Sequence, residues 1–193
     1  MSVTFIISTR LPSVMMATVV RFVSETDRHQ NVLLFSMKLK LISPKDLTWP
    51  LLFKASEPVT DVKTQVVPHL RNMRELMEGA GGAGLAACQV SVFFRFFIYG
   101  GRWLGNPELV LTVINPSLNF PNPAKEIANE GCLSFPGLHK PVERYKEVEL
   151  TYTDLAGNSK TIELDGMIAR VIQHEVDHTN GLCIFDSNSG MAS

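Results

Sequence analysis

The pattern of apolar and polar positions first indicates a helix between residues 62 and 77. Apolar side chains recur there at spacings of three and four, which places them on one helical face: Val62, Val66, Leu70, Met73 and Met77. Thr60 or Asp61 can cap the start of this helix, and Gly79 follows where a helix C-terminus favours glycine. Pro68 interrupts the pattern, so we expect a kink or a later start.

Further along, four segments have the composition or the alternation of β-strands. Phe93–Tyr99 is aromatic, and Leu109–Ile114 is rich in β-branched residues and ends at Asn115-Pro116. Glu147–Thr153 and Lys160–Leu164 alternate between apolar and polar residues on either side of a short turn, which predicts a hairpin.

A second helix is predicted near the C-terminus. Asp165 can cap it, Asn180-Gly181 can end it, and its apolar positions are Met167, Val171, Ile172 and Val176. Leu39–Phe53 contains two prolines and reads as loop with short extended pieces. The order helix, strands, helix predicts an α+β domain, in which antiparallel strands pack around this second helix.

Composition bounds the class of protein. A chain of 193 residues with 45% hydrophobic and 19% charged residues is typical of one globular domain. The net charge of -1 argues against a broad attraction to nucleic acid or anionic membrane, and no apolar stretch reaches the roughly 18 residues of a membrane helix. The three cysteines, Cys88, Cys132 and Cys183, predict a reducing compartment and at least one free thiol.

We expect residues 1–37 to be an N-terminal extension and residues 38–193 to form the catalytic domain. Leu11–Val20 is mildly apolar and flanked by arginines, as in a transit peptide, and Met37 offers a more usual domain start. The extension is therefore a dispensable upstream segment, a targeting segment or a structured addition, and the sequence leaves these alternatives open.

Residues 174–178 read His-Glu-Val-Asp-His and carry the most chemical information. On a helix, His174 and His178 lie on one face about a turn apart, where two imidazoles can hold one divalent metal. Glu175 can act beside them as a general base on water. The alternative is an amphipathic helix with two histidines by chance, but the chain has only five histidines in all.

A catalytic metal of this kind needs a third protein ligand and an open fourth position. Downstream of His178 the only acid or histidine is Asp186, in a predicted loop. Upstream, Glu130-Gly131-Cys132-Leu133-Ser134 offers the thiolate of Cys132, a strong ligand for a borderline-soft metal. Taken alone, Cys132 would more often be buried and inert, but beside the histidine pair it is better interpreted as a ligand.

The segment Gly82–Gln89 (GAGLAACQ) is rich in small residues. It lacks the preceding strand and the later acidic residue of a dinucleotide-binding fingerprint. We expect its backbone to lie close to a substrate, with the carboxamide of Gln89 as the kind of donor that an oxyanion hole requires.

Segments 82–89, 130–134 and 173–178 together resemble the three signature motifs of peptide deformylase, in the same order and at similar spacing. A weaker similarity extends from about Leu39 to Asp186, and includes Asn115-Pro116. The resemblance implies a hydrolase of protein biosynthesis that removes the N-terminal formyl group from formylmethionine of newly synthesised polypeptides and releases formate.

The resemblance also implies roles for the motif residues. Three would bind one metal ion, natively ferrous iron and often zinc in preparations: Cys132, His174 and His178. The same ligands suit nickel and cobalt. Glu175 would be the acid/base catalyst, and Gln89 with the backbone N–H of Leu133 would stabilise the oxyanion.

By the same resemblance, the substrate peptide would pair with the backbone near Gly84 as an added strand. Four positions match the pocket for the methionine side chain: Ala83, Ala128, Met167 and Val171. Arg170 stands where the family commonly has an apolar residue at the pocket mouth. We interpret it as a solvated helix position, with a cation that contacts the peptide as the alternative. Cys88 replaces a small residue or proline before Gln89 and is interpreted as packing.

Partners and location are expectations only. The chain ends at Ser193, whereas many members of the family carry a long C-terminal extension. We therefore expect at most a transient contact with the ribosome, made without such an extension. We expect a cytoplasmic monomer, or a mitochondrial or plastid protein if residues 1–36 are a transit segment. Two rival functions remain: a zinc endopeptidase with a third ligand after His178, and an inactive relative that binds N-terminal peptides or stores metal.

Overall fold

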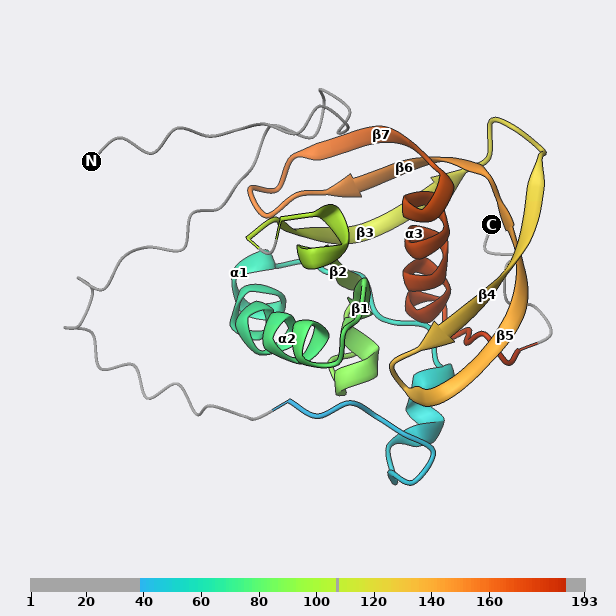
Figure 1. Cartoon of the computed structure of the whole chain (residues 1–193). Helices are drawn as coiled ribbons and strands as arrows, with labels where there is room; N and C mark the ends of the chain where they lie inside the picture. The colour runs from blue at the N-terminus through green and yellow to red at the C-terminus, as the bar shows by residue number, and fades with distance from the viewer. Residues whose placement is uncertain (1–38, 107, 187–193) are drawn as a thin grey trace, which may run out of the picture. The chain divides into compact units, whose positions relative to one another are not determined.

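A helix near the C-terminus, α3 (Gly166–Thr179), lies between two antiparallel sheets in the computed structural model (Figure 1). The structure describes residues 39–106 and 108–186, all of which belong to the unit Met37–Ser193. The predicted extension, residues 1–37, lies outside the described residues. The order of elements confirms the α+β prediction, with antiparallel strands around the helix that carries the histidine motif.

The larger sheet contains five strands: β1 (Gly84–Ala86), β2 (Phe96–Gly100), β3 (Val110–Asn119), β6 (Glu147–Thr153) and β7 (Ser159–Asp165). They lie in the order β1-β2-β3-β6-β7, and every pair is antiparallel. The predicted hairpin is confirmed as β6 and β7. β1 is an edge strand of this sheet, which leaves its second edge without a partner strand among the described residues.

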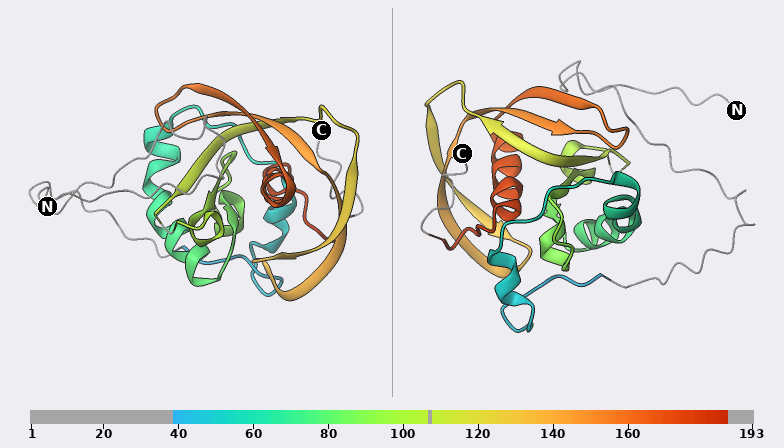
Figure 2. Two further views of the ribbon diagram at one scale, coloured as in Figure 1. Left: turned by 45° about the horizontal axis from the view of Figure 1, so that its top comes forward. Right: turned by 180° about the vertical axis from the view of Figure 1, so that it is seen from behind.

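The second sheet pairs β4 (Lys125–Cys132) with β5 (Phe135–Tyr145), and neither strand was predicted from the sequence. Most side chains of β4 are exposed, so its sequence shows little apolar alternation. β5 contains two prolines and a glycine, which usually mark loops. The two views in Figure 2 show this ribbon curving around the outside of α3.

One strand is longer than predicted. β3 was expected to end at Asn115-Pro116, but it continues to Asn119 with a register shift between Ile114 and Ser117. Asn115 takes a left-handed backbone conformation with φ 50°, and its side chain exchanges two hydrogen bonds of 2.9 Å with the backbone N–H and C=O of Val59. Pro116 therefore lies at an irregularity of the strand, and such irregularities are positions where β-sheets accept proline.

The predicted first helix is divided, as Pro68 suggested, into α1 (Val62–Gln65) and α2 (Val67–Gly79). Asp61 caps α1 by accepting a hydrogen bond from the backbone N–H of Lys63. The apolar face of these helices packs in the core with residues from β1 and β2, including Leu85, Phe96 and Ile98. Within the predicted loop 39–53, Trp49–Phe53 forms a short 3-10 helix.

Burial on several sides distinguishes α3 from an ordinary amphipathic surface helix. Nine of its residues are buried, and six of these carry polar or charged side chains that need partners: Arg170, Gln173, Glu175, Asp177, His178 and Thr179. Asp165 occupies the predicted cap position, but its side chain makes no capping hydrogen bond. In the described part of the chain, no helix is both long and apolar enough to span a membrane.

Candidate metal and catalytic site

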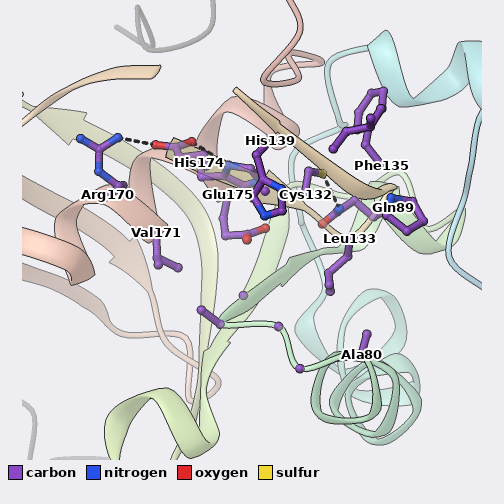
Figure 3. Close-up of a pocket in the computed structure, with 18 of the residues that line it drawn as sticks. Ala80, Gln89, Cys132, Leu133, Phe135, His139, Arg170, Val171, His174 and Glu175 are labelled. Carbon is purple, nitrogen blue, oxygen red and sulfur yellow. Dashed lines mark hydrogen bonds and ion pairs between the residues drawn. The ribbon is translucent and has the colours of Figure 1, made fainter. Parts of the chain in front are cut away.

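The three predicted metal ligands meet at one point of the structure. His174 and His178 lie one turn apart on α3, and Cys132 is the last residue of β4. One potential ligand atom from each residue lies within 4.8 Å of the others, and Sγ of Cys132 is 3.2 Å from Nε2 of His178. Figure 3 shows two of the three residues, Cys132 and His174. Asp186, the downstream acid, is not in this group.

The chemistry of these donors fits a divalent metal ion. One sulfur and two imidazole nitrogens form a ligand set that borderline-soft metals favour, and three protein ligands leave a fourth position for substrate. Burial lowers the pKa of His178, and the nearby His174 lowers it further. A neutral imidazole is the form that binds a metal.

A carboxylate behind His174 orients that imidazole. Oε2 of Glu130 lies 3.0 Å from Nδ1 of His174, which leaves Nε2 of the same ring for the metal. Arg144 donates to both oxygens of Glu130, at 3.0 and 2.9 Å. Burial alone would raise the pKa of Glu130, but hydrogen bonds with His174 and Arg144 lower it to about 2. Glu130 is therefore a buried, ionised partner of the metal site.

Glu175 has the properties of a catalytic base. It is 4% exposed, and its Oε2 atom has no hydrogen-bond partner among the described residues. A Cβ atom on Gly84 would lie 2.5 Å from Oε1 of this carboxylate, so β1 passes close to it. Burial raises the pKa of Glu175 to about 7. A carboxylate with such a pKa can both accept and return a proton near neutral pH.

Gln89 lies in a 3-10 helix, Ala87–Val90, directly after β1. Its Oε1 accepts a hydrogen bond from the backbone N–H of Ala86 at 2.9 Å, which fixes the orientation of the carboxamide. Its Nε2 donates to Oγ of Ser134 at 3.2 Å and faces Sγ of Cys132 at 3.5 Å. The predicted donor therefore points toward the metal ligands.

A cleft of about 610 Å³ opens onto these residues. Five of the residues predicted to bind the substrate line it: Ala83, Gly84, Met167, Arg170 and Val171. Leu133 also lines the cleft, and its side chain packs against Gly82. Ala128, predicted for the methionine pocket, is not among the lining residues, whereas its neighbour Asn129 is.

The interpretation of Arg170 as a solvated helix position is wrong. Arg170 is only 5% exposed, and its Nη1 lies 2.7 Å from Oε1 of Glu130. The sequence did not indicate this ion pair because the acidic partner, Glu130, lies on another element, 40 residues away. Cys88 is confirmed as a packed residue: it is 1% exposed, and its thiol donates to the carbonyl oxygen of His178 at 3.3 Å.

Several lining residues of the cleft were missed in the sequence. Phe135, Leu138 and His139 come from β5, which itself was not predicted. Trp103 is 60% exposed at the edge of the cleft, and its indole N–H donates to the carbonyl oxygen of Gly81 at 3.3 Å. A tryptophan in the glycine-rich turn 100–105 was a signal that could have indicated a binding surface.

Comparisons with known proteins agree with these features. A family model described as polypeptide deformylase matches residues 45–192. A peptide deformylase of Thermotoga neapolitana is 42% identical over 137 residues, which cover 71% of this chain and 80% of the relative. The crystal structure of peptide deformylase from Thermotoga maritima has a TM-score of 0.69 at 38% identity and covers 77% of this chain and 95% of that chain.

One of the solved relatives contains a peptide. A peptide deformylase from Acinetobacter baumannii, crystallised with Met-Ala-Ser bound, has a TM-score of 0.64 at 28% identity. The match covers 77% of this chain and 96% of that chain.

Proposed function

This chain belongs to the peptide deformylase family, and we propose that it removes the formyl group from the N-terminal formylmethionine of newly synthesised polypeptides, with Glu175 as its acid/base catalyst. One observation carries the assignment of roles. The ligand atoms of Cys132, His174 and His178 lie within 4.8 Å of one another, beside the buried carboxylate of Glu175, whose Oε2 has no hydrogen-bond partner in the part of the chain that the structure describes.

A divalent metal held by these three residues supplies Lewis-acid chemistry, which polarises a carbonyl and lowers the pKa of water. The protein's own residues move the proton. Glu175 accepts a proton from the attacking water at Oε2, and its raised pKa makes it basic enough for this step. The same carboxyl group then passes the proton to the departing amine, so that formate and a free N-terminus are released.

Two groups are proposed to stabilise negative charge on the formyl oxygen. Nε2 of Gln89 already points toward the metal ligands, and its orientation is fixed by the bond from Ala86. The backbone N–H of Leu133 follows Cys132 in the chain and would be the second donor. Donors held in place before the reaction stabilise a developing oxyanion without reorganisation.

The substrate peptide is proposed to extend the larger sheet. β1 is an edge strand, and Gly84 lies directly over Glu175. A peptide that pairs with this edge would gain backbone hydrogen bonds regardless of its sequence. Its methionine side chain would lie against Val171 and Met167, which line the same cleft. The bound Met-Ala-Ser in the Acinetobacter baumannii relative supports a short peptide as ligand.

The test is an assay with formyl-Met-Ala-Ser and with the unblocked peptide. We expect formate release from the first and no cleavage of internal bonds in either. Glu175→Gln should reduce kcat by roughly 10²- to 10⁴-fold, as expected for loss of a general base, and should leave the metal content unchanged. The matched control is Glu163→Gln on β7, an exposed carboxylate that should not affect kcat. Internal cleavage without deformylation would instead support an endopeptidase.

The native metal is proposed to be ferrous iron, with zinc, nickel or cobalt as ions that the same ligands accept. The donor set supports a borderline metal but does not select one. Metal analysis of protein purified without oxygen tests this proposal. We expect iron and an activity that falls on exposure to air, whereas a zinc-loaded, air-stable enzyme would contradict it.

We further propose a cytoplasmic monomer that contacts the ribosome transiently, or an organellar protein if residues 1–36 act as a transit segment. Fusing residues 1–36 to a fluorescent protein decides between the two compartments. Light scattering during size-exclusion chromatography tests the monomer, and co-sedimentation with ribosomes that carry formylated nascent chains tests the contact.

A further inference from the structure

Arg170 joins the helix that carries two metal ligands to the sheet that carries the third. It lies one turn before His174 on α3, so the two side chains lie on the same helical face. Its Nη1 donates to Oε1 of Glu130 at 2.7 Å and to the carbonyl oxygen of Val142 at 3.0 Å. Its Nη2 donates to the carbonyl oxygen of Glu126 at 2.9 Å. One guanidinium therefore binds residues of both β4 and β5.

The carboxylate of Glu130 transmits this contact to the metal site. Arg170 binds Oε1, while His174 lies 3.0 Å from Oε2 of the same carboxylate. Arg144 spans both oxygens from β5. Each oxygen of Glu130 thus has two donors, and the position of the carboxylate depends on all three side chains.

The covalent arrangement explains why this matters for Cys132. Cys132 ends β4 only two residues after Glu130, whereas His174 belongs to α3. The distance between the thiolate and the imidazole therefore depends on how β4 is held against α3. Arg170 supplies buried hydrogen bonds across that junction, and a rigid fork of donors is suited to fix it.

We propose that Arg170 is a positioning residue for the metal centre, which acts on His174 through Glu130 and on Cys132 through β4. The expected effect of Arg170 on catalysis rests on the proposed function, whereas its expected effect on metal affinity does not. This proposal differs from the expectation that Arg170 contacts the substrate as a cation. The guanidinium already donates to one carboxylate and two backbone carbonyls.

The experiment measures zinc affinity by competition with a chelator, without substrate, for wild type, Arg170→Met and Arg170→Lys. We expect Arg170→Met to weaken zinc binding by roughly 10- to 100-fold, as for other partners of metal ligands. Arg170→Lys should recover only part of this loss, because a lysine keeps the charge but not the fork. Arg71→Met, at an exposed arginine on α2, is the matched control and should not change the affinity.

A second arm separates positioning from substrate contact. kcat and KM are measured with formyl-Met-Ala-Ser and with its C-terminal amide. We expect kcat to fall equally for both peptides. The proposal would be overturned in favour of peptide contact if zinc affinity were unchanged and KM increased only for the peptide with a free C-terminal carboxylate. Unchanged zinc affinity with only a lower Tm would overturn it in favour of a purely structural role.

The experiment still tests the proposal if Arg170→Met does not fold or if the wild type has no deformylase activity. If Arg170→Met does not fold by circular dichroism, Arg170→Lys decides alone, and an affinity equal to that of wild type contradicts the proposal. Absence of deformylase activity in the wild type would refute the proposed function, whereas the zinc measurement would still test Arg170.

Discussion

The Glu175 carboxylate occupies space that is free because Gly84 has no side chain. A Cβ atom at position 84 would lie 2.5 Å from Oε1, and 2.8 Å from both Cδ and Cγ, of Glu175. Both Cγ and the carboxylate would have to move, so the side chain cannot simply rotate its far end. The glycine motif of β1 and the acid of α3, 91 positions apart in the sequence, are thus parts of one arrangement.

Gly84→Ala should therefore impair catalysis more than folding. Displacement of a catalytic group by about 1 Å can reduce the rate by roughly 10²-fold, and we expect a decrease in kcat of that order. Metal content should remain unchanged, because the three atoms nearest to the added Cβ all belong to Glu175, which is not a predicted ligand. Gly79→Ala is the control, since a Cβ atom there would meet nothing within 4 Å. Full activity of Gly84→Ala would show that Glu175 works from another position.

Gln89→Glu tests the oxyanion donor with little change in shape. The new carboxylate can still accept from the backbone N–H of Ala86, but it has no N–H to donate toward Cys132 and Ser134. Loss of one such donor typically lowers kcat by roughly 10²- to 10³-fold. Steady-state kinetics on a metal-loaded sample, with metal content as the check, measures this. An unaltered kcat would remove Gln89 from the catalytic step.

Val171→Phe tests the methionine pocket. Val171 lines the cleft, so a phenylalanine should occupy space needed by the substrate and lower kcat/KM for formyl-Met-Ala-Ser by roughly 10- to 200-fold. Val67→Phe, at a residue of α2 that is 51% exposed, is the matched control. Zinc affinity should be the same in both variants. A KM that does not respond would place the methionine side chain elsewhere in the cleft.

Asn115→Ala tests the irregularity in β3. The substitution removes two hydrogen bonds to the backbone of Val59, which is 7% exposed, and leaves its N–H and C=O without these partners. An unsatisfied buried polar group costs about 1–3 kcal/mol, so the free energy of unfolding should fall by about 2–4 kcal/mol. Urea unfolding measures it. Asn119→Ala, which removes two exposed hydrogen bonds, one to Glu149 and one from the backbone N–H of Phe120, should change it by less than about 0.5 kcal/mol.

Local sequence was sufficient for features that depend on neighbours along the chain. The spacing of His174 and His178 sets them on one face of any helix, and Pro68 divides the first helix through the geometry of its own ring. The alternation in β6 and β7 predicted their hairpin. These interactions span few residues, so residue type and periodicity determine them.

Only the tertiary structure decided what distant segments do together. β4 and β5 lack a clear apolar period because most of their side chains stay exposed, yet they carry Cys132 and much of the cleft. Arg170 seemed a surface residue because its partner, Glu130, lies 40 positions away. The sequence by itself determined which residues could bind a metal and move a proton. The docking of β4 on α3 decided their distances, because burial brings an arginine, a carboxylate and an imidazole together in an arrangement that local spacing does not encode.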